Sequence, residues 1–372
     1  MHGRVVLYRS LGLLHSRPYT TSRPASPLRS ARCGLGGTSL MTLANRGVAA
    51  ARKLQRWFKR RVLRQPWMME EFASPILQES LLLDKARCDA YREAIHRTVK
   101  PGDVVVDLGA GTGLLSFFAL QAGARHVYAM EMSRIADAAA ELIEANGFQD
   151  RITLIRKNSR RVRLPERCDV LVTETLSAFC FDAENIIEFV ADARERFLKP
   201  GARIIPESAD TFLMPFSSDA FGAGRLPPRY YDLDFQPFSK RLFKTCGLVR
   251  ASGQPFVSLS RPAPIYHIDF RKDTQNPGKT FAPFRITADG RLDGFLGWFE
   301  ARLCEGVTLS NSPYLPLTHW WQLYLPLLKQ PHYRAGQTIL LYLDPNIVAG
   351  EAAWNYAVQP AEPDSQKPRL TL

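Results

Sequence analysis

The chain has 372 residues, enough for two domains of ordinary size, and 45% of them are hydrophobic, which is typical of a folded globular protein. The formal net charge is +13, but the first 69 residues hold 14 Lys and Arg and no acid, while the remaining 303 carry 35 basic and 36 acidic residues. Because a nucleic-acid-binding protein carries its basic surface on the folded domain, nucleic acid is not expected as a partner of the folded part. A membrane-spanning helix needs a run of about 18 apolar residues, and the sequence has none.

The six cysteines are dispersed and show neither a C-x-x-C pair nor the His/Cys spacing of a zinc site. We therefore expect reduced thiols and no metal site.

Residues 1–66 form a basic extension that lacks acids and contains Arg-Pro and Ser-Pro steps, which oppose regular structure. This composition is that of an organellar transit peptide, but it also fits a disordered basic tail, or translated upstream sequence with the start at Met41. We expect a cytoplasmic protein, with the mitochondrial matrix as the alternative if residues 1–66 include a transit peptide.

The next segment, residues 67–205, is predicted to be an α/β domain. Residues 68–100 favour one helix, which ends at Pro101-Gly102. Strands and helices then alternate: strand 104–107, helix 114–122, strand 126–131, helix 133–146, strands 152–156 and 169–174, helix 184–197, and a strand near 203–205. This alternation predicts a doubly wound, Rossmann-like parallel sheet with its ligand site beyond the carboxyl ends of the strands.

Beyond Pro206 the pattern changes to short aromatic and β-branched runs that are broken by Pro and Gly. These runs predict an all-β, β-barrel-like second domain over residues 206–360, followed by a C-terminal tail, 361–372.

The strongest local motif begins at Val104, where an apolar strand ends at Asp107 and opens into Gly109, Gly111 and Gly113 before a helix. These glycines allow the backbone to approach a nucleotide closely. A dinucleotide fingerprint would place a further glycine at position 114, which is Leu here. The D-x-G-x-G-x-G form resembles the first motif of class I methyltransferases, which bind S-adenosyl-L-methionine. Glu131 ends the next strand, where a carboxylate can accept both ribose hydroxyls of an adenosine.

Three further segments resemble the protein arginine methyltransferases. Thr318-His319-Trp320 looks like their T-H-W loop, and the segment from Gln78 through Asp84 and Arg87 is similar to their helix that covers the cofactor. The third, Thr173-Glu174-Thr175, resembles the start of their double-glutamate loop. The resemblance covers about residues 68–360.

The resemblance implies roles for several of these residues. Arg87 would pair with the methionine carboxylate of the cofactor, a task suited to a fork-shaped guanidinium. His319 would pair with Asp84, as a proton exit or as a clamp between the domains, and both interpretations stay open. Phe72 and Trp320 would contact the substrate.

Two carboxylates suit an arginine substrate, because a protonated guanidinium is a poor nucleophile. They can neutralise its charge and hold one nitrogen on line with the transferred methyl group. Glu174 is the expected first carboxylate. The family's second glutamate lies nine residues later, where this chain has Ala183, so we expect Glu184 to serve, with Glu188 or Asp182 as alternatives. Asn158 stands where the family often has an acidic pair near the adenine, and it could still bind the adenine amine.

The sequence therefore predicts an enzyme that transfers methyl from S-adenosyl-L-methionine to arginine in protein substrates. Family members dimerise through an arm, so we expect a homodimer, with residues 217–245 as a shortened arm. One alternative is an enzyme of the same fold that methylates a small molecule or another acceptor. The other is a non-catalytic cofactor-binding homologue.

Overall fold

The computed structural model describes residues 72–183, 185–221, 226–242, 246–348 and 351–361. All of these residues belong to one compact unit of the chain, Gln55–Leu372. The expected basic extension (1–66), the tail (361–372, except Ala361) and Glu184 lie outside the described residues.

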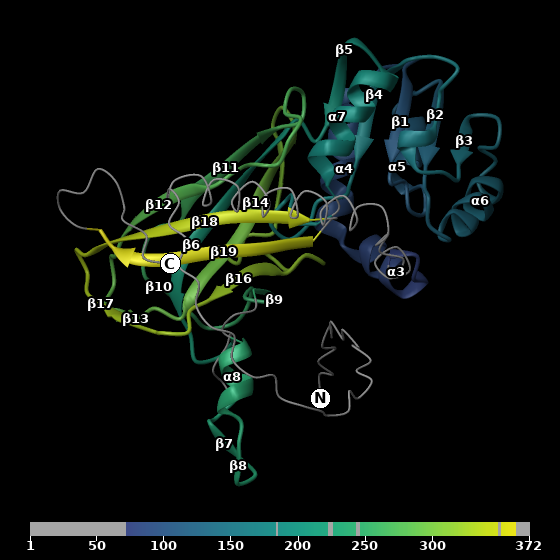
Figure 1. Ribbon diagram of the computed structural model, residues 1–372. Helices are drawn as coiled ribbons and strands as arrows, with labels where there is room; N and C mark the ends of the chain where they lie inside the picture. The colour runs from purple at the N-terminus through teal and green to yellow at the C-terminus, as the bar shows by residue number, and fades with distance from the viewer. Residues whose placement is uncertain (1–71, 184, 222–225, 243–245, 349–350, 362–372) are drawn as a thin grey trace, which may run out of the picture. The chain divides into compact units, whose positions relative to one another are not determined.

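The first half of the described chain builds a five-stranded parallel sheet with the order β3-β2-β1-β4-β5 (Figure 1). Its strands are β1 (Val104–Leu108), β2 (His126–Met130), β3 (Ile152–Ile155), β4 (Cys168–Thr173) and β5 (Leu198–Ile205). The connecting helices are α5 (Leu114–Gln121), α6 (Ala136–Ala145), the short 3-10 helix η1 (Ser159–Arg161) and α7 (Ile186–Phe197). The predicted doubly wound sheet is confirmed.

The strand order reverses between β1 and β4, because the chain runs outward from β1 through β2 and β3 and then returns to β4. At such a switch point a crevice opens beyond the carboxyl ends of the strands. Leu108 pairs with Thr173 in the register of β1 and β4, so the next residues, Gly109 and Glu174, leave the sheet side by side.

The single helix expected over residues 68–100 is wrong in one respect. The chain forms two helices, α3 (Pro75–Leu83) and α4 (Lys85–Thr98), which meet at Asp84 with a non-helical ψ of 86°. The Asp84 carboxylate accepts the backbone N–H of Arg87 at 3.1 Å and so caps α4. The other expected elements are present with shifted ends, and β5 begins at Leu198 rather than near 203.

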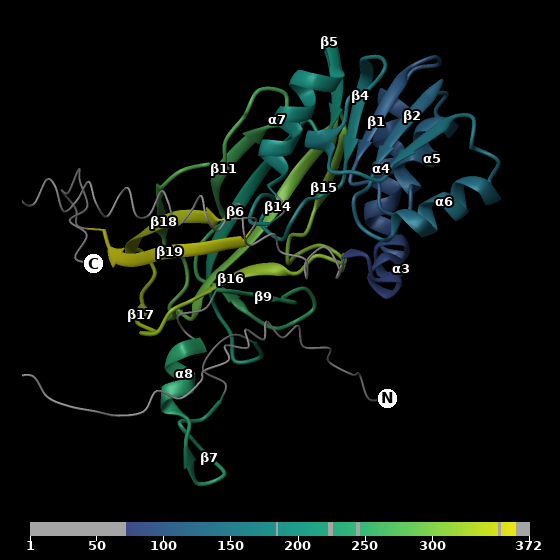
Figure 2. The ribbon, with the colours of Figure 1, turned by 45° about the vertical axis from the view of Figure 1, so that its right-hand side comes forward.

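The second half is antiparallel, as predicted. Its largest sheet has the order β10-β6-β14-β16-β9, with β11 beside β6 and β15 beside β14, and Figure 2 shows β11, β6 and β14 side by side. These strands are β6 (Ser208–Ser217), β9 (Gly247–Val249), β10 (Val257–Ser258), β11 (Ala263–Asp269), β14 (Gly294–Cys304), β15 (Val307–Ser310) and β16 (Gln322–Pro326). Smaller sheets join β12 (Thr280–Arg285), β18 (Thr338–Val348) and β19 (Glu351–Pro360), and β13 (Gly290–Arg291) with β17 (His332–Tyr333).

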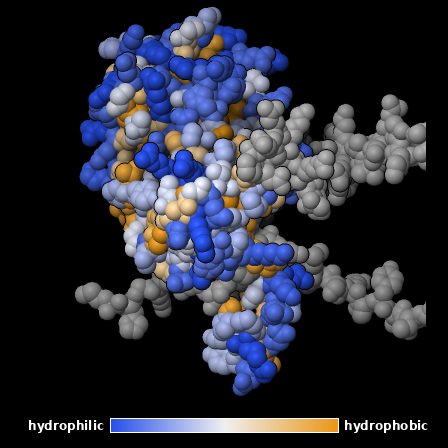
Figure 3. All heavy atoms as spheres, turned by 90° about the vertical axis from the view of Figure 1, so that its left-hand side faces the viewer, coloured by the Kyte–Doolittle hydropathy of each residue, from blue (hydrophilic) through white to orange (hydrophobic). Residues whose placement is uncertain are grey.

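The segment expected to be an arm, residues 217–245, contains β7 (Arg229–Tyr230), β8 (Leu233–Asp234) and a helix that the sequence did not predict, α8 (Gln236–Leu242). These elements project from the antiparallel sheets (Figure 1). Several of their large apolar side chains are exposed, and apolar atoms stand among hydrophilic ones on this projection (Figure 3).

Both halves of the described chain share one hydrophobic core, which contains Val105 of β1, Tyr91 of α4, Phe299 of β14 and Leu341 of β18. The loop after β4 enters this core through Phe179 and Phe181. Residues of the two halves are therefore packed together where β4 ends. Among the helices that the structure describes, none is long and apolar enough to cross a bilayer.

Candidate active site

The turn after β1 needs glycine at defined positions. Gly109, Gly111 and Gly113 all have positive φ, at 72°, 55° and 87°. A Cβ on Gly109 would also lie 2.9 Å from Cγ2 of Thr175, at the end of β4. The sequence therefore produces a turn whose glycines place no side chains at the switch point, so a nucleotide can approach the backbone closely.

Asp107 is fully buried at the end of β1. Its Oδ2 accepts the hydroxyl of Ser116 at 2.7 Å, whereas its Oδ1 has no hydrogen-bond partner among the described residues. Burial raises the pKa of Asp107 to about 7, and the bond from Ser116 offsets this only in part. Since buried polar atoms are nearly always hydrogen-bonded, the orphaned Oδ1 is an acceptor that a donor from a bound molecule would satisfy.

Glu131 follows β2 at the same edge of the sheet. Its two oxygens accept the backbone N–H groups of Gly111 at 3.1 Å and Ser133 at 2.7 Å. A carboxylate has about four lone-pair sites, so these bonds fix its orientation and leave acceptors for two hydroxyls.

Asn158 is exposed at the start of η1. Its Oδ1 accepts the N–H of Arg160 at 3.0 Å, and its Nδ2 lies 3.7 Å from Sδ of Met132, next to Glu131. The turn is fixed to α7 by Arg196, which donates to the carbonyls of Ser159 and Val162 at 2.7 Å each. An adenosine-containing cofactor fits this edge of the sheet. It would find there the glycine turn, the unpaired Oδ1 of Asp107, the oriented carboxylate of Glu131 and the nearby Asn158.

Arg87 and Glu174 form one buried ion pair. The two side chains are 10% and 6% exposed, and Nε of Arg87 donates to Oε2 of Glu174 at 2.5 Å. Burial lowers the pKa of Arg87, but the charge and hydrogen bond of Glu174, together with the neighbouring Cys88 and Tyr91, raise that pKa overall. The residue expected to hold the cofactor carboxylate thus also orients the first acid of the substrate site.

The three candidates for the second acid differ in placement. Glu184 lies outside the described residues. Oδ1 of Asp182 accepts the Ser177 hydroxyl at 2.5 Å and the Phe179 N–H at 2.8 Å, so this carboxylate closes the loop on itself. Glu188 lies on α7 and pairs with Arg160 at 3.4 Å. The contacts of Asp182 and Glu188 are structural, which favours neither as the partner of Glu174.

His319 and Asp84 are brought together as the resemblance implied. Oδ2 of Asp84 accepts the backbone N–H of His319 at 2.8 Å and lies 2.9 Å from Nδ1 of its ring. Burial raises the pKa of Asp84, but its bonds to His319 and to the Arg87 amide lower it overall. Because Asp84 also caps α4, this contact joins the helix pair to the antiparallel half.

Trp320 and Phe72 are placed differently from each other. Trp320 is 7% exposed, and its indole N–H donates to the carbonyl of Leu176 at 2.7 Å. It therefore supports the loop after Glu174 from within the core. Phe72 is 37% exposed, and its carbonyl accepts the Gln78 amide at 2.9 Å. No group of three His, Cys, Asp or Glu side chains in the described part of the chain is arranged to hold a metal.

Sequence reasoning missed several residues that contact the loop after Glu174, among them Asn311 and Gly297. Asn311 bonds to the carbonyl of Ala178, and Gly297 lies against the ring of Phe179. Neither residue belongs to a motif, and both are more than 100 positions from the loop in the sequence. Asn311 stands seven residues before Thr318, and this position near the T-H-W segment is the one sequence signal that could have drawn attention to it.

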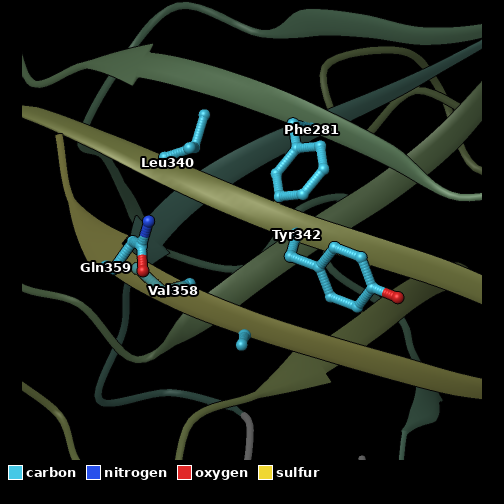
Figure 4. Close-up of a pocket in the computed structure, with 6 residues that line it drawn as sticks. Phe281, Leu340, Tyr342, Val358 and Gln359 are labelled. Atoms are coloured by element: carbon cyan, nitrogen blue, oxygen red, sulfur yellow. The ribbon is translucent and has the colours of Figure 1, made fainter. Parts of the chain in front are cut away.

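Two surface hollows contain none of the predicted site residues. One, of about 10 Å³, lies on the sheet of β12, β18 and β19 and is lined by Phe281, Leu340 and Tyr342 among others (Figure 4). The other, of about 610 Å³, lies around the start of β5 and is lined by Arg167, Arg194, Lys199 and Arg271 among others. The candidate site is thus defined by its side chains at the switch point.

Comparisons with known proteins agree with this geometry. A family model described as ribosomal protein L11 methyltransferase matches residues 92–207. The probable histone-arginine methyltransferase 1.3 of Arabidopsis thaliana is 34% identical over 288 residues, covering 70% of this chain and 52% of that relative. The histone-arginine methyltransferase CARMER of Drosophila grimshawi is 31% identical over 278 residues, covering 70% of this chain and 51% of that relative. The chain spans about half the length of the curated relatives it matches.

Solved structures share the fold. The Trypanosoma brucei PRMT1 enzyme-prozyme complex with AdoHcy aligns with a TM-score of 0.69 and 23% identity, over 78% of this chain and 99% of that one. The open conformation of Arabidopsis thaliana protein arginine methyltransferase 10 aligns with a TM-score of 0.65 and 22% identity, over 79% of this chain and 100% of that one. With a glycine turn, Glu174 and a T-H-W segment at one switch point, the chain belongs to the protein arginine methyltransferase family of class I methyltransferases.

Proposed function

We propose that this protein transfers the methyl group of S-adenosyl-L-methionine to a guanidino nitrogen of arginine in protein substrates. The observation that carries the proposal is the buried Glu174, which leaves β4 beside Gly109 and is oriented by Arg87. An acid in this place can hold a cationic acceptor next to the cofactor site. Similarity to histone-arginine methyltransferases over 70% of the chain supports the same acceptor.

The cofactor would be held at both ends. The glycine turn and Glu131 would take the adenosine, with Asn158 at the adenine, while Arg87 would pair with the methionine carboxylate. Oδ1 of Asp107 would accept a hydrogen bond from the bound molecule. When bound, the cofactor supplies an electrophilic methyl on a sulfonium, whose sulfur leaves as a neutral thioether.

Glu174 would then act on the substrate. Its carboxylate keeps lone pairs beyond the bond from Arg87, and these can accept N–H groups of a substrate guanidinium. This contact offsets the positive charge and fixes the nitrogen that attacks, so the contribution is positioning and electrostatics. The proton that this nitrogen loses on methylation would pass to the carboxylate and from there to solvent. We assign the role of the second acid to Glu184, since Asp182 and Glu188 have the structural contacts described above.

His319 would act as a clamp more than as a proton exit. Asp84 binds both its ring and its backbone N–H, and the same carboxylate caps α4. These bonds hold the T-H-W segment of the antiparallel half against the helices near the cofactor.

The test is transfer of labelled methyl from S-adenosyl-L-methionine to Arg-Gly-rich peptides, comparing the intact protein with Glu174→Gln and Glu184→Gln. We expect arginine to be labelled, and each substitution to lower the rate at least about 100-fold, the size of losing one charge-stabilising group. Glu188→Gln is the matched control and should keep its rate within a few-fold. If the cofactor binds but no arginine is labelled, the arginine assignment fails.

A second candidate function keeps the cofactor and changes the acceptor to a small molecule or another nucleophile. It is favoured by Ala183, which stands where the family has its second glutamate. Labelling of a small amine with retained dependence on Glu174 would establish it. Cofactor binding without transfer to any acceptor would instead indicate a non-catalytic homologue.

We also propose that two copies of the chain associate through the arm. Tyr231, Leu233 and Phe238 of this segment are 81%, 62% and 52% exposed, and Ile76 and Leu83 of α3 are 79% and 74% exposed. Monomeric proteins rarely leave apolar side chains this exposed in clusters. Association of the arm of one copy with α3 of the other would cover both sets.

A further inference from the structure

The loop that follows Glu174, residues 175–183, is here named the acid loop. It is closed by reciprocal bonds between the backbones of Ser177 and Cys180, and Asp182 accepts from Ser177 and Phe179. Cys180 takes a φ of +71°, a conformation that favours glycine. A loop of this kind keeps its internal shape, so what holds the loop as a whole adds to β4 and Arg87 in fixing the position of Glu174.

The antiparallel half holds the acid loop by packing. Phe179 is fully buried, and a Cβ on Gly297 of β14 would lie 2.8 Å from its ring. Trp354 of β19 lies edge-on to the same ring, with 5.4 Å between the centroids. This contact fixes the depth of the loop, but it leaves the loop carbonyls to be bound by polar groups.

A side-chain amide binds one of these carbonyls. Asn311, 2% exposed, follows β15, and its Nδ2 donates to the carbonyl of Ala178 in the acid loop and to the carbonyl of Trp321, each at 2.9 Å. Its Oδ1 accepts the N–H of Phe299 in β14 at 2.8 Å. Both ends of the amide are thus used, and they join the distant acid loop to β14 and to the residue that follows the T-H-W segment.

We propose that Asn311 is a positioning residue for methyl transfer, which sets the place of Glu174 relative to the T-H-W segment. This inference rests on the proposed function, since it concerns the same site. The hydrogen bonds of the Asn311 side chain go to Phe299, Ala178 and Trp321, so it acts on Glu174 through the carbonyl of Ala178, four residues after that acid. Trp320, which donates to Leu176, supports the same loop from the neighbouring position.

The chemistry of the position requires an amide. Aspartate has the same shape but no donor, so its carboxylate would face the two carbonyl oxygens that Asn311 now binds. Alanine would leave both carbonyls and the Phe299 N–H buried without this partner. Either change should loosen the acid loop while the glycine turn and Glu131 stay in place.

The experiment uses the full chain with Asn311→Asp and Asn311→Ala. Asp293→Asn is the control, since Asp293 is 3% exposed in the same half and binds Ser218 and Arg291 instead of the acid loop. Amide exchange of residues 175–183 is measured by mass spectrometry, together with kcat and KM for transfer and the Kd for the cofactor. We expect faster exchange in the acid loop and a kcat lowered at least tenfold in both Asn311 variants, with the cofactor Kd within threefold.

Each outcome decides one question. If the intact protein methylates arginine and the Asn311 variants keep its kcat, or if the control loses as much kcat, the inference fails. If the intact protein methylates nothing, the proposed function fails, and loop exchange still decides whether Asn311 holds the acid loop. Unchanged exchange in both variants overturns the inference whatever the activity.

Discussion

The pair of Arg87 and Glu174 concentrates two roles in one contact. Two opposite charges that are almost fully removed from water stabilise a protein little as a pair, yet breaking the pair leaves one charge buried without its partner. The pair is therefore better explained by the geometry it imposes on Glu174 than by stability.

A double-mutant cycle in chemical denaturation tests this explanation. We expect Arg87→Met and Glu174→Leu each to lower the free energy of unfolding by about 3–5 kcal/mol, because each leaves an uncompensated charge. The double substitution should lose less than either single one. A double variant whose loss equals the sum of the two would show that the charges do not interact.

Asp107 makes stability depend on pH. Its folded pKa, about 7, lies above the ordinary aspartate pKa of 3.8, so between these values the folded chain binds a proton that the unfolded chain does not. Stability from this group is therefore present at low pH and is lost as pH rises toward 7 and beyond. In Asp107→Asn this dependence disappears.

We expect the difference in unfolding free energy between Asp107→Asn and the intact protein to change by about 2–3 kcal/mol between pH 5 and pH 8. The variant gains relative stability as pH rises. Urea titrations of both proteins at several pH values measure it, and parallel curves would contradict the assignment.

At the scale of elements, the break between α3 and α4 is the feature that brings Asp84 to the site. A continuous helix through residue 84 would use the Arg87 N–H within the helix, and Asp84 could not serve as its cap. The break thus lets one carboxylate cap α4 and bind His319 at once.

Two substitutions separate these roles of Asp84. Asparagine still caps a helix, so Asp84→Asn should cost about 1 kcal/mol through the weaker bond to His319, and Asp84→Ala about 2–3 kcal/mol through loss of both. Because the folded pKa of Asp84 is lowered, its contribution is present above the ordinary aspartate pKa of 3.8 and is lost as pH falls below it. Thermal unfolding at pH 7 checks the order, and equal losses would show that the cap is the weaker contact.

Elements that are determined by neighbouring residues could be predicted, whereas those that depend on contacts between distant parts of the chain could not. β1 and its glycine turn have a local pattern, an apolar run that ends in residues with positive φ, and were predicted almost to the residue. The break at Asp84 was missed because the apolar pattern continues through it. The helix α8 was missed because it lies in a segment of mixed polarity. Arg87, Glu174, Asp84 and His319 were named through motifs, whereas Asn311 owes its role to a contact with a carbonyl 133 residues away.

At the scale of the whole molecule, the described site needs both halves of the chain. The parallel half supplies the glycine turn, Glu131 and Glu174, and the antiparallel half supplies His319, Trp320 and Asn311, which bind backbone or side chains of the first half. Proper placement of α3 and α4 therefore matters to both the cofactor and the acceptor. An association that covers α3 would steady this region.

The arm provides the test at this scale. We expect the double substitution Tyr231→Glu and Leu233→Glu to convert a dimer into a monomer, because burying two carboxylates in an apolar contact costs more than the contact gains. The same variant should lose at least about tenfold in methyl transfer if covering α3 orders the site, a loss of about 1.4 kcal/mol in transition-state stabilisation. Analytical ultracentrifugation and the transfer assay measure the two effects.

The control is Leu328→Glu, which changes a side chain 49% exposed in the antiparallel half outside the arm. This variant should stay dimeric and active. If the intact protein is monomeric, or if the monomeric variant is fully active, association is not coupled to catalysis. If the intact protein is a dimer and the arm variant alone loses both dimerisation and methyl transfer, the interface lies on Tyr231 and Leu233.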